Sequence, residues 1–125
     1  MKKILIVEDD NILSKAINTA LTEEGYKTLI AIDGEEALIK VKEFEPDLIL
    51  LDLILPKKSG EEVLAEIKKD EKTKNILVLV ATVKSENESI SRCVELGARG
   101  YFIKSDYTLE EIVNQIKKAL LEIGK

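Results

Sequence analysis

Residues 48–56 read Leu-Ile-Leu-Leu-Asp-Leu-Ile-Leu-Pro, and this stretch decides the fold. Its first four residues are all apolar, and a carboxylate, Asp52, follows them directly. A strand with one face in water alternates apolar and polar residues, whereas a strand covered on both faces is apolar throughout. Residues 48–51 are therefore predicted to form a strand inside a parallel sheet, with helices packed on both of its faces.

The rest of the chain repeats this arrangement on either side of the central strand. Short apolar runs rich in β-forming residues lie at residues 4–7, 28–31, 76–81 and 101–103. Stretches with helical spacing lie between and after these runs. In the first of them an apolar stripe consists of Ile12, Leu13, Ala16, Ile17, Ala20 and Leu21. Five strands, five helices and right-handed crossovers predict an α/β fold with a doubly wound parallel sheet, in the order 2-1-3-4-5.

The ends of the predicted helices carry local signals. A capping side chain stands three residues before a glutamate at Asp33, Ser59, Ser85 and Thr108. This spacing lets the two side chains satisfy free N–H groups of the first helical turn. Gly25 and Gly97 follow the first and fourth helices, where glycine often ends a helix.

The composition indicates one folded domain. The chain has 125 residues, of which 45% are hydrophobic and 34% charged, so we expect a single domain over residues 1–125 without an effector domain. Its 24 acidic and 19 basic residues give a net charge of −5, which argues against direct contact with nucleic acid. We expect a monomer or a weak dimer.

Single residue types exclude further classes of function. The one cysteine, Cys93, cannot form an intrachain disulfide and is interpreted as a small core residue. Because the chain has no histidine, it cannot contain a histidine metal ligand, a histidine general base or a phosphohistidine. No apolar run is long enough for a signal peptide or a membrane span, so we expect a cytoplasmic protein without membrane contact.

Chemically useful side chains follow the predicted strands. Ligands of such sheets bind at the carboxyl ends of the strands. The first strand leads into Glu8, Asp9 and Asp10, and the third into Asp52. If these strands are neighbours, the carboxylates converge and resist sharing one site unless a hard cation with oxygen ligands compensates them. Mg²⁺ suits such a site.

The fourth and fifth predicted strands add a hydroxyl and an ammonium, from Thr82 and Lys104. Alone, a threonine after a strand is ordinary helix-cap material and a lysine is usually solvated. Together with the acids they form a phosphate cradle, in which lysine pairs with phosphate and the cation neutralises developing charge. Asp52 is then left as a carboxylate nucleophile.

These motifs resemble the receiver domain of two-component response regulators over essentially the whole chain. The likeness rests on residues 4–10, on residues 50–56 with Gly60, on Ala81 with Thr82, and on residues 97–104. The resemblance implies a flavodoxin-like fold. It also implies that Asp52 accepts a phosphoryl group from a sensor histidine kinase, a phosphotransfer protein or a small phosphodonor.

The resemblance assigns further roles to individual residues. Asp9, Asp52 and the backbone carbonyl of Ile54 would hold Mg²⁺, and Glu8 would assist through the metal's water shell. Thr82 and Lys104 would engage the phosphoryl oxygens. Tyr101 would change rotamer with Thr82, although a tyrosine at this place is by itself more often core packing. A downstream protein would then read the surface formed by the fourth helix, fifth strand and fifth helix.

Two departures from the family pattern stand out. The family usually has proline after its lysine, whereas Ser105 follows Lys104 here, so the geometry of this peptide bond is open. Residues two past the acceptor and two past the threonine tune attack by water in receivers, and here they are Ile54 and Lys84. Because Ile54 cannot orient water, we expect slow self-dephosphorylation.

Three other functions are alternatives to this interpretation. A phosphatase of this type needs a second acid two residues after its nucleophile, where this chain has Ile54. A flavin or nucleotide binder needs a loop rich in glycine, serine or threonine after the first strand, where acids stand instead. The remaining alternative is an interaction module with a receiver fold that works without phosphorylation.

Overall fold

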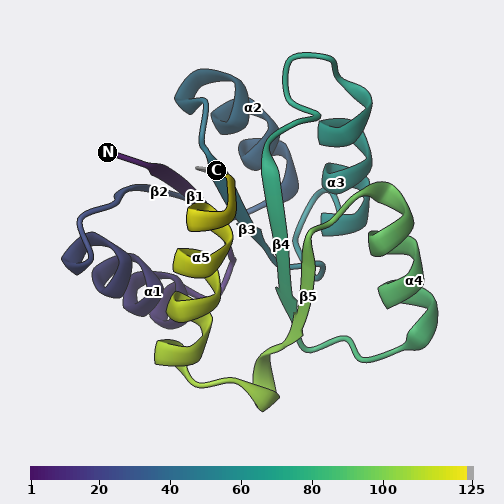
Figure 1. Ribbon diagram of the computed structural model, residues 1–125. Coiled ribbons are helices and arrows are strands. Elements are labelled where there is room, and N and C mark those ends of the chain that lie inside the picture. Colours follow the sequence, from purple (N-terminus) through teal and green to yellow (C-terminus); the bar gives the residue numbers. More distant parts are fainter. Residues whose placement is uncertain (124–125) are drawn as a thin grey trace.

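The computed structural model describes residues 1–123, so the last two residues of the predicted domain lie outside the described part. Five strands form one sheet: β1 Lys3–Val7, β2 Lys27–Ala31, β3 Leu48–Leu51, β4 Leu77–Thr82 and β5 Gly100–Ile103. All neighbouring strands are parallel, in the order β2-β1-β3-β4-β5 (Figure 1). The predicted sheet is confirmed, and the predicted strands match to within one residue at each end.

Five α-helices connect and follow the strands, as the sequence predicts. They are α1 Asn11–Glu23, α2 Gly34–Phe44, α3 Gly60–Lys69, α4 Asn87–Leu96 and α5 Leu109–Ile123. A single 3₁₀ turn, Lys104–Asp106, separates β5 from α5.

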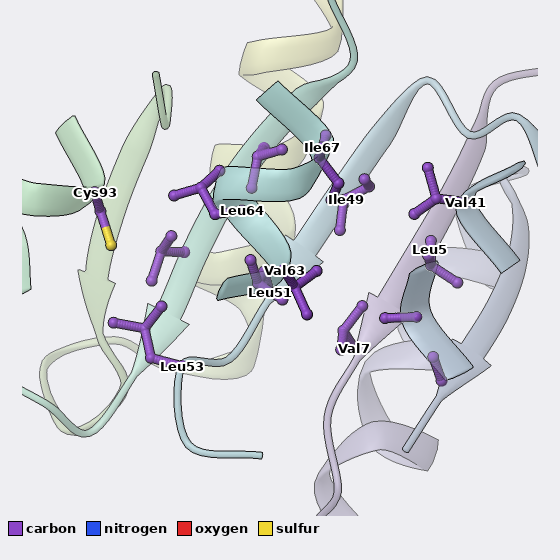
Figure 2. Packing of buried hydrophobic residues seen from close by; sticks show 14 residues of the cluster. Leu5, Val7, Val41, Ile49, Leu51, Leu53, Val63, Leu64, Ile67 and Cys93 are labelled. Carbon is purple, nitrogen blue, oxygen red and sulfur yellow. The ribbon is translucent and has the colours of Figure 1, made fainter. Parts of the chain in front are cut away.

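The sheet divides the core into two clusters, because neighbouring residues of a strand point to opposite faces. On one face Leu5, Ile49 and Val78 pack with side chains of α2, α3 and α4, Cys93 among them (Figure 2). On the other face Ile4, Leu48 and Leu79 pack with α1 and α5. All four residues of β3 are buried, which confirms the central strand, and Cys93 is a core residue as predicted.

Most of the predicted helix caps are present. The side chains of Asp33, Ser59 and Thr108 accept hydrogen bonds from the backbone N–H groups of Glu36, Glu62 and Glu111. The prediction for Ser85 is wrong, because α4 begins at Asn87 and its cap residue, Glu86, makes no side-chain capping bond. Gly25 and Gly97 each follow a helix and adopt a positive φ, as predicted for glycines that end helices.

Two further observations concern the surface. Ile12 does not belong to the buried stripe of α1, since it is 84% exposed at the start of the helix, whereas Ile17 and Leu21 are buried. Among the helices of residues 1–123, none combines the length and the apolar character that a membrane crossing requires.

Candidate functional site

The first and third strands bring two acidic side chains next to each other. Val7 of β1 is paired in register with Leu51 of β3, so Glu8 and Asp52 are the next residues of adjacent strands. The backbone N–H of Asp52 donates to the carbonyl oxygen of Val7 at 3.1 Å, which continues the sheet for one more residue. The predicted convergence of these strand ends is therefore present in the structure.

Asp9 completes a cluster of three carboxylates. One carboxylate oxygen from each of Glu8, Asp9 and Asp52 lies within 4.8 Å of the other two. Glu8 and Asp52 are buried, whereas Asp9 is exposed and leaves the cluster open to solvent. Mg²⁺ binds oxygen ligands, usually one or two carboxylates, and keeps several water molecules, for which the open side of this cluster leaves room. The residues present thus fit a magnesium ion.

Lys104 supplies positive charge to the same cluster. Its Nζ atom donates a hydrogen bond to Oδ2 of Asp52 at 2.8 Å and another to Oε1 of Glu8. The lysine is well placed because Thr82 and Ile103 are paired at the ends of β4 and β5, so residue 104 leaves the sheet at its carboxyl edge. No peptide bond within residues 1–123 is cis, and Lys104 enters the site with Ser105 after it.

Burial and charge shape the ionisation of this group. Burial raises the pKa of Glu8, and the nearby charge of Asp52 acts in the same direction, although hydrogen bonds from Lys104 and from the N–H of Asp10 oppose it. Burial lowers the pKa of Lys104, but the hydrogen bonds and charges of Asp52 and Glu8 outweigh it and raise that pKa overall. The Lys104 ammonium therefore keeps its positive charge beside the three carboxylates.

The residues that flank the acids have separate roles. Asp10 is the cap of α1, where its side chain accepts from the N–H groups of Ile12 and Leu13. Oδ1 of Asp52 accepts from the N–H of Ile54 at 3.2 Å, while the Ile54 side chain is 52% exposed. The role predicted for the Ile54 carbonyl as a metal ligand stays a prediction.

Gly60 allows α3 to start against the backbone of Asp52. A Cβ atom at residue 60 would lie 2.1 Å from the carbonyl oxygen of Asp52, which is far inside contact distance. The N–H of Gly60 also donates to the carbonyl of Leu53 at 2.9 Å. The first turn of α3 and the end of β3 are therefore fixed relative to each other.

The side chains of Thr82 and Tyr101 both form hydrogen bonds with the backbone of Lys84. Thr82 is fully buried at the end of β4, and its Oγ1 accepts from the N–H of Lys84 at 3.4 Å. The hydroxyl of Tyr101 donates to the carbonyl oxygen of Lys84 at 2.9 Å. Burial is the main reason that the pKa of Tyr101 is raised to about 12. The backbone of Lys84 is thus a link between the two predicted switch residues.

Sequence reasoning missed this link and a nearby ion pair. The family pattern predicts only that Lys84 tunes attack by water, whereas in the structure its Nζ lies 3.4 Å from Oε1 of Glu61. No sequence spacing could have shown this pair, because 23 positions and a whole strand separate its members.

Fold and site together define a doubly wound α/β domain with a carboxylate pocket and a lysine at the carboxyl edge of its sheet. Residues 4–117 match the family model described as the response regulator receiver domain. The chain therefore belongs to the response regulator receiver domain family. Receiver domains are phosphorylatable signalling switches of two-component systems, and binding of Mg²⁺ at an acidic pocket is typical of them.

Curated relatives agree with this assignment. The chain is 37% identical over 119 residues to the sporulation initiation phosphotransferase F of Bacillus subtilis, covering 95% of this chain and 94% of that protein. It is 32% identical over 119 residues to the DNA-binding response regulator MtrA of Mycolicibacterium paratuberculosis, covering 95% of this chain and 51% of the relative. The chain thus spans about half the length of that DNA-binding relative.

Solved structures share the fold over nearly the whole chain. A CheY-like receiver domain protein from Methanospirillum hungatei superposes with a TM-score of 0.90 at 29% identity, over 98% of this chain and 95% of that one. The Mn²⁺-bound form of the response regulator Rcp1 has a TM-score of 0.86 at 36% identity, over 98% of this chain and 96% of that one. The second structure is a divalent-metal complex of a similar protein.

Proposed function

We propose that this chain is a magnesium-dependent switch in which Asp52 accepts a phosphoryl group. The donor would be a sensor histidine kinase, a phosphotransfer protein or a small phosphodonor. The observation that carries the proposal is the ammonium of Lys104 held between Asp52 and Glu8, beside the exposed carboxylate of Asp9. The ammonium next to Asp52, together with a divalent ion that the open acidic cluster would hold, would compensate the negative charge that a phosphoryl group adds.

The transfer needs a nucleophile and a way to balance charge. A carboxylate oxygen of Asp52 attacks the phosphorus atom and forms an acyl-phosphate. The bond from phosphorus to the donor's imidazole nitrogen or acyl oxygen breaks, and its electron pair leaves with the donor. Lys104 pairs with the arriving phosphoryl oxygens, and the Thr82 hydroxyl donates to one of them. Mg²⁺, held by Asp9, Asp52 and the Ile54 carbonyl with Glu8 assisting, would supply positive charge to the transferring group.

The output would pass through the Thr82–Tyr101 pair. Drawing the Thr82 hydroxyl toward the phosphoryl group changes its bond to the Lys84 N–H, and the Lys84 carbonyl holds Tyr101. The surface of α4, β5 and α5 then presents two arrangements to a downstream protein. On this proposal the chain does not contact nucleic acid itself.

Turnover of external substrates is not part of the proposal. The side chain two residues past Asp52 is the apolar Ile54, which can neither protonate a leaving group nor orient water. The chain would therefore promote only its own phosphorylation and a slow hydrolysis of the acyl-phosphate.

Intact-mass analysis after incubation with acetyl phosphate and Mg²⁺ tests the proposal. We expect a gain of about 80 Da in the wild type, as one phosphoryl group adds. Asp52→Asn should show no gain, while Asp106→Asn, which changes an exposed acid beyond Lys104, should gain the same mass as wild type. An unmodified wild type that also fails to bind beryllofluoride with Mg²⁺ would favour a phosphorylation-independent interaction module.

A further inference from the structure

The segment between β4 and α4 is held at Lys84 from three directions. The N–H of Lys84 donates to Thr82, and its carbonyl accepts from Tyr101. Its side chain reaches α3, where Nζ lies 3.4 Å from Oε1 of Glu61. A shift of this one residue therefore changes the surroundings of both switch side chains.

Of the three partners of Lys84 just described, Thr82 lies on β4, Tyr101 lies on β5, and Glu61 lies on α3. Its side chain is 17% exposed, and its second oxygen, Oε2, lies 3.9 Å from an Nη atom of Arg92 on α4. One carboxylate thus ties the first turn of α3 to both the β4–α4 segment and α4. Gly60 packs the same turn against the Asp52 backbone, so the position of Glu61 is fixed relative to the end of β3.

An acid in the first helical turn also interacts favourably with the helix dipole, and this simpler role has to be separated. Glu62 is the neighbouring first-turn acid of α3, and its backbone N–H donates the capping hydrogen bond to the Ser59 hydroxyl. Of the two, Glu61 faces Lys84 and Arg92. The dipole argument applies to both glutamates, whereas the contacts with the switch segment belong to Glu61.

We propose that Glu61 is a positioning residue of the switch, which through Lys84 favours the arrangement in which the Tyr101 hydroxyl bonds the Lys84 carbonyl. The inference rests on the proposed function for its consequence in signalling. The coupling itself, from Glu61 on α3 through Lys84 to Tyr101, would already be present in the unphosphorylated protein.

Two further features support this coupling. After burial and the influence of Cys93, the charge of Glu61 is among the causes that raise the pKa of Tyr101, so the two side chains interact electrostatically. A hollow of about 290 Å³ lies against Glu61 and Lys84, and Glu86 and Glu88 also line it. If Glu61 were made neutral, the Lys84 side chain would have space to move within this hollow, which Glu86 and Glu88 also line.

The test measures the rotamer of Tyr101 by NMR in the unphosphorylated protein, using three-bond couplings that report χ1. Glu61→Gln and Lys84→Gln should each lower the ratio of the described rotamer to the others by roughly two- to fivefold, as expected for a partly exposed ion pair. The double variant should change the ratio no further than either single variant, because both remove the same interaction.

Glu62→Gln is the matched control and should leave the ratio at its wild-type value. The inference is overturned if Glu61→Gln behaves like this control, or if the effects of the two single variants add. Should Glu61→Gln fail to fold, the partly exposed Lys84→Gln alone decides, and an unchanged Tyr101 ratio in it rejects the coupling. Mass analysis of Asp52 phosphorylation in the same samples tests the proposed function separately.

Discussion

The Nζ atom of Lys104 lies 2.8 Å from Oδ2 of Asp52, and the same nitrogen donates to Glu8. One partly buried ammonium therefore pairs with two carboxylates that are adjacent because β1 pairs with β3. In the absence of a divalent ion, this lysine supplies the positive charge that makes the pocket tolerable. Its position connects the stability of the domain with metal binding.

Replacing Lys104 with methionine should destabilise the metal-free protein. The change leaves Glu8 and Asp52 buried without their cation, so we expect the free energy of unfolding to fall by about 2–3 kcal/mol. Saturating Mg²⁺ should restore most of this loss, because an ion that binds only the folded state stabilises it. Urea unfolding with and without Mg²⁺ measures both effects. Lys117→Met, which removes a surface pair with Glu24, should leave the unfolding curve close to that of the wild type and serves as the control.

Replacing Gly60 with alanine should disturb the backbone at Asp52, just after β3. The added Cβ would lie 2.1 Å from the carbonyl oxygen of Asp52, so the backbone must shift. We expect the free energy of unfolding to fall by about 3 kcal/mol or more. Gly25→Ala is the matched variant, since its Cβ meets nothing within 4 Å and only its positive φ is strained. That strain costs roughly 1–2 kcal/mol. Equal thermal stability of the two variants would contradict the close approach.

Replacing Ile54 with asparagine should shorten the life of the acyl-phosphate. A carboxamide at this exposed position can hydrogen-bond an attacking water, which isoleucine cannot. We expect hydrolysis to become about tenfold faster, a change of ~1.4 kcal/mol in the barrier. The decay of the phosphorylated mass with time measures it. Ile39→Asn, at an exposed position on α2, should decay at the wild-type rate, and equal rates in both variants would refute the role of Ile54.

Tyr101 should give the folded protein a defined alkaline pH dependence. Its folded pKa of about 12 lies above the ordinary value of 10.0, mainly because the phenol is partly buried. Between these values the unfolded chain has lost a proton that the folded chain keeps, so stability falls as pH rises from 10 toward 12. Absorbance at 295 nm should show a late phenol titration that Tyr101→Phe lacks. If that variant titrates like wild type, the late step belongs elsewhere.

The sequence predicted the sheet and the acidic pocket because both follow from strand burial. A run such as Leu48 to Leu51 can be placed only in the middle of a covered sheet, and Asp52 must then leave it at the carboxyl edge. The parallel order brings Glu8 to the same point. Periodicity and the rule for parallel sheets were therefore sufficient for these residues.

Contacts between distant elements were beyond such reasoning. The start of α4 was placed at a Ser85 cap from local spacing, yet the helix begins at Asn87. The chain just before it is held by Tyr101 from β5 and by Glu61 from α3, which no local pattern records. Ile12 also fits the apolar period of α1 but lies at its exposed first turn, where no neighbouring layer covers it.

The division of the core by the sheet has a consequence for how the molecule tolerates change. Tyr101 packs with the cluster under α2, α3 and α4, whereas α1 and α5 close a separate cluster on the opposite side. A rearrangement near α4 can therefore loosen one half of the interior while the other half keeps its packing intact. We therefore expect that mutations which weaken packing in the cluster beneath α2, α3 and α4 leave the cluster beneath α1 and α5 packed, so that they need not unfold the whole domain.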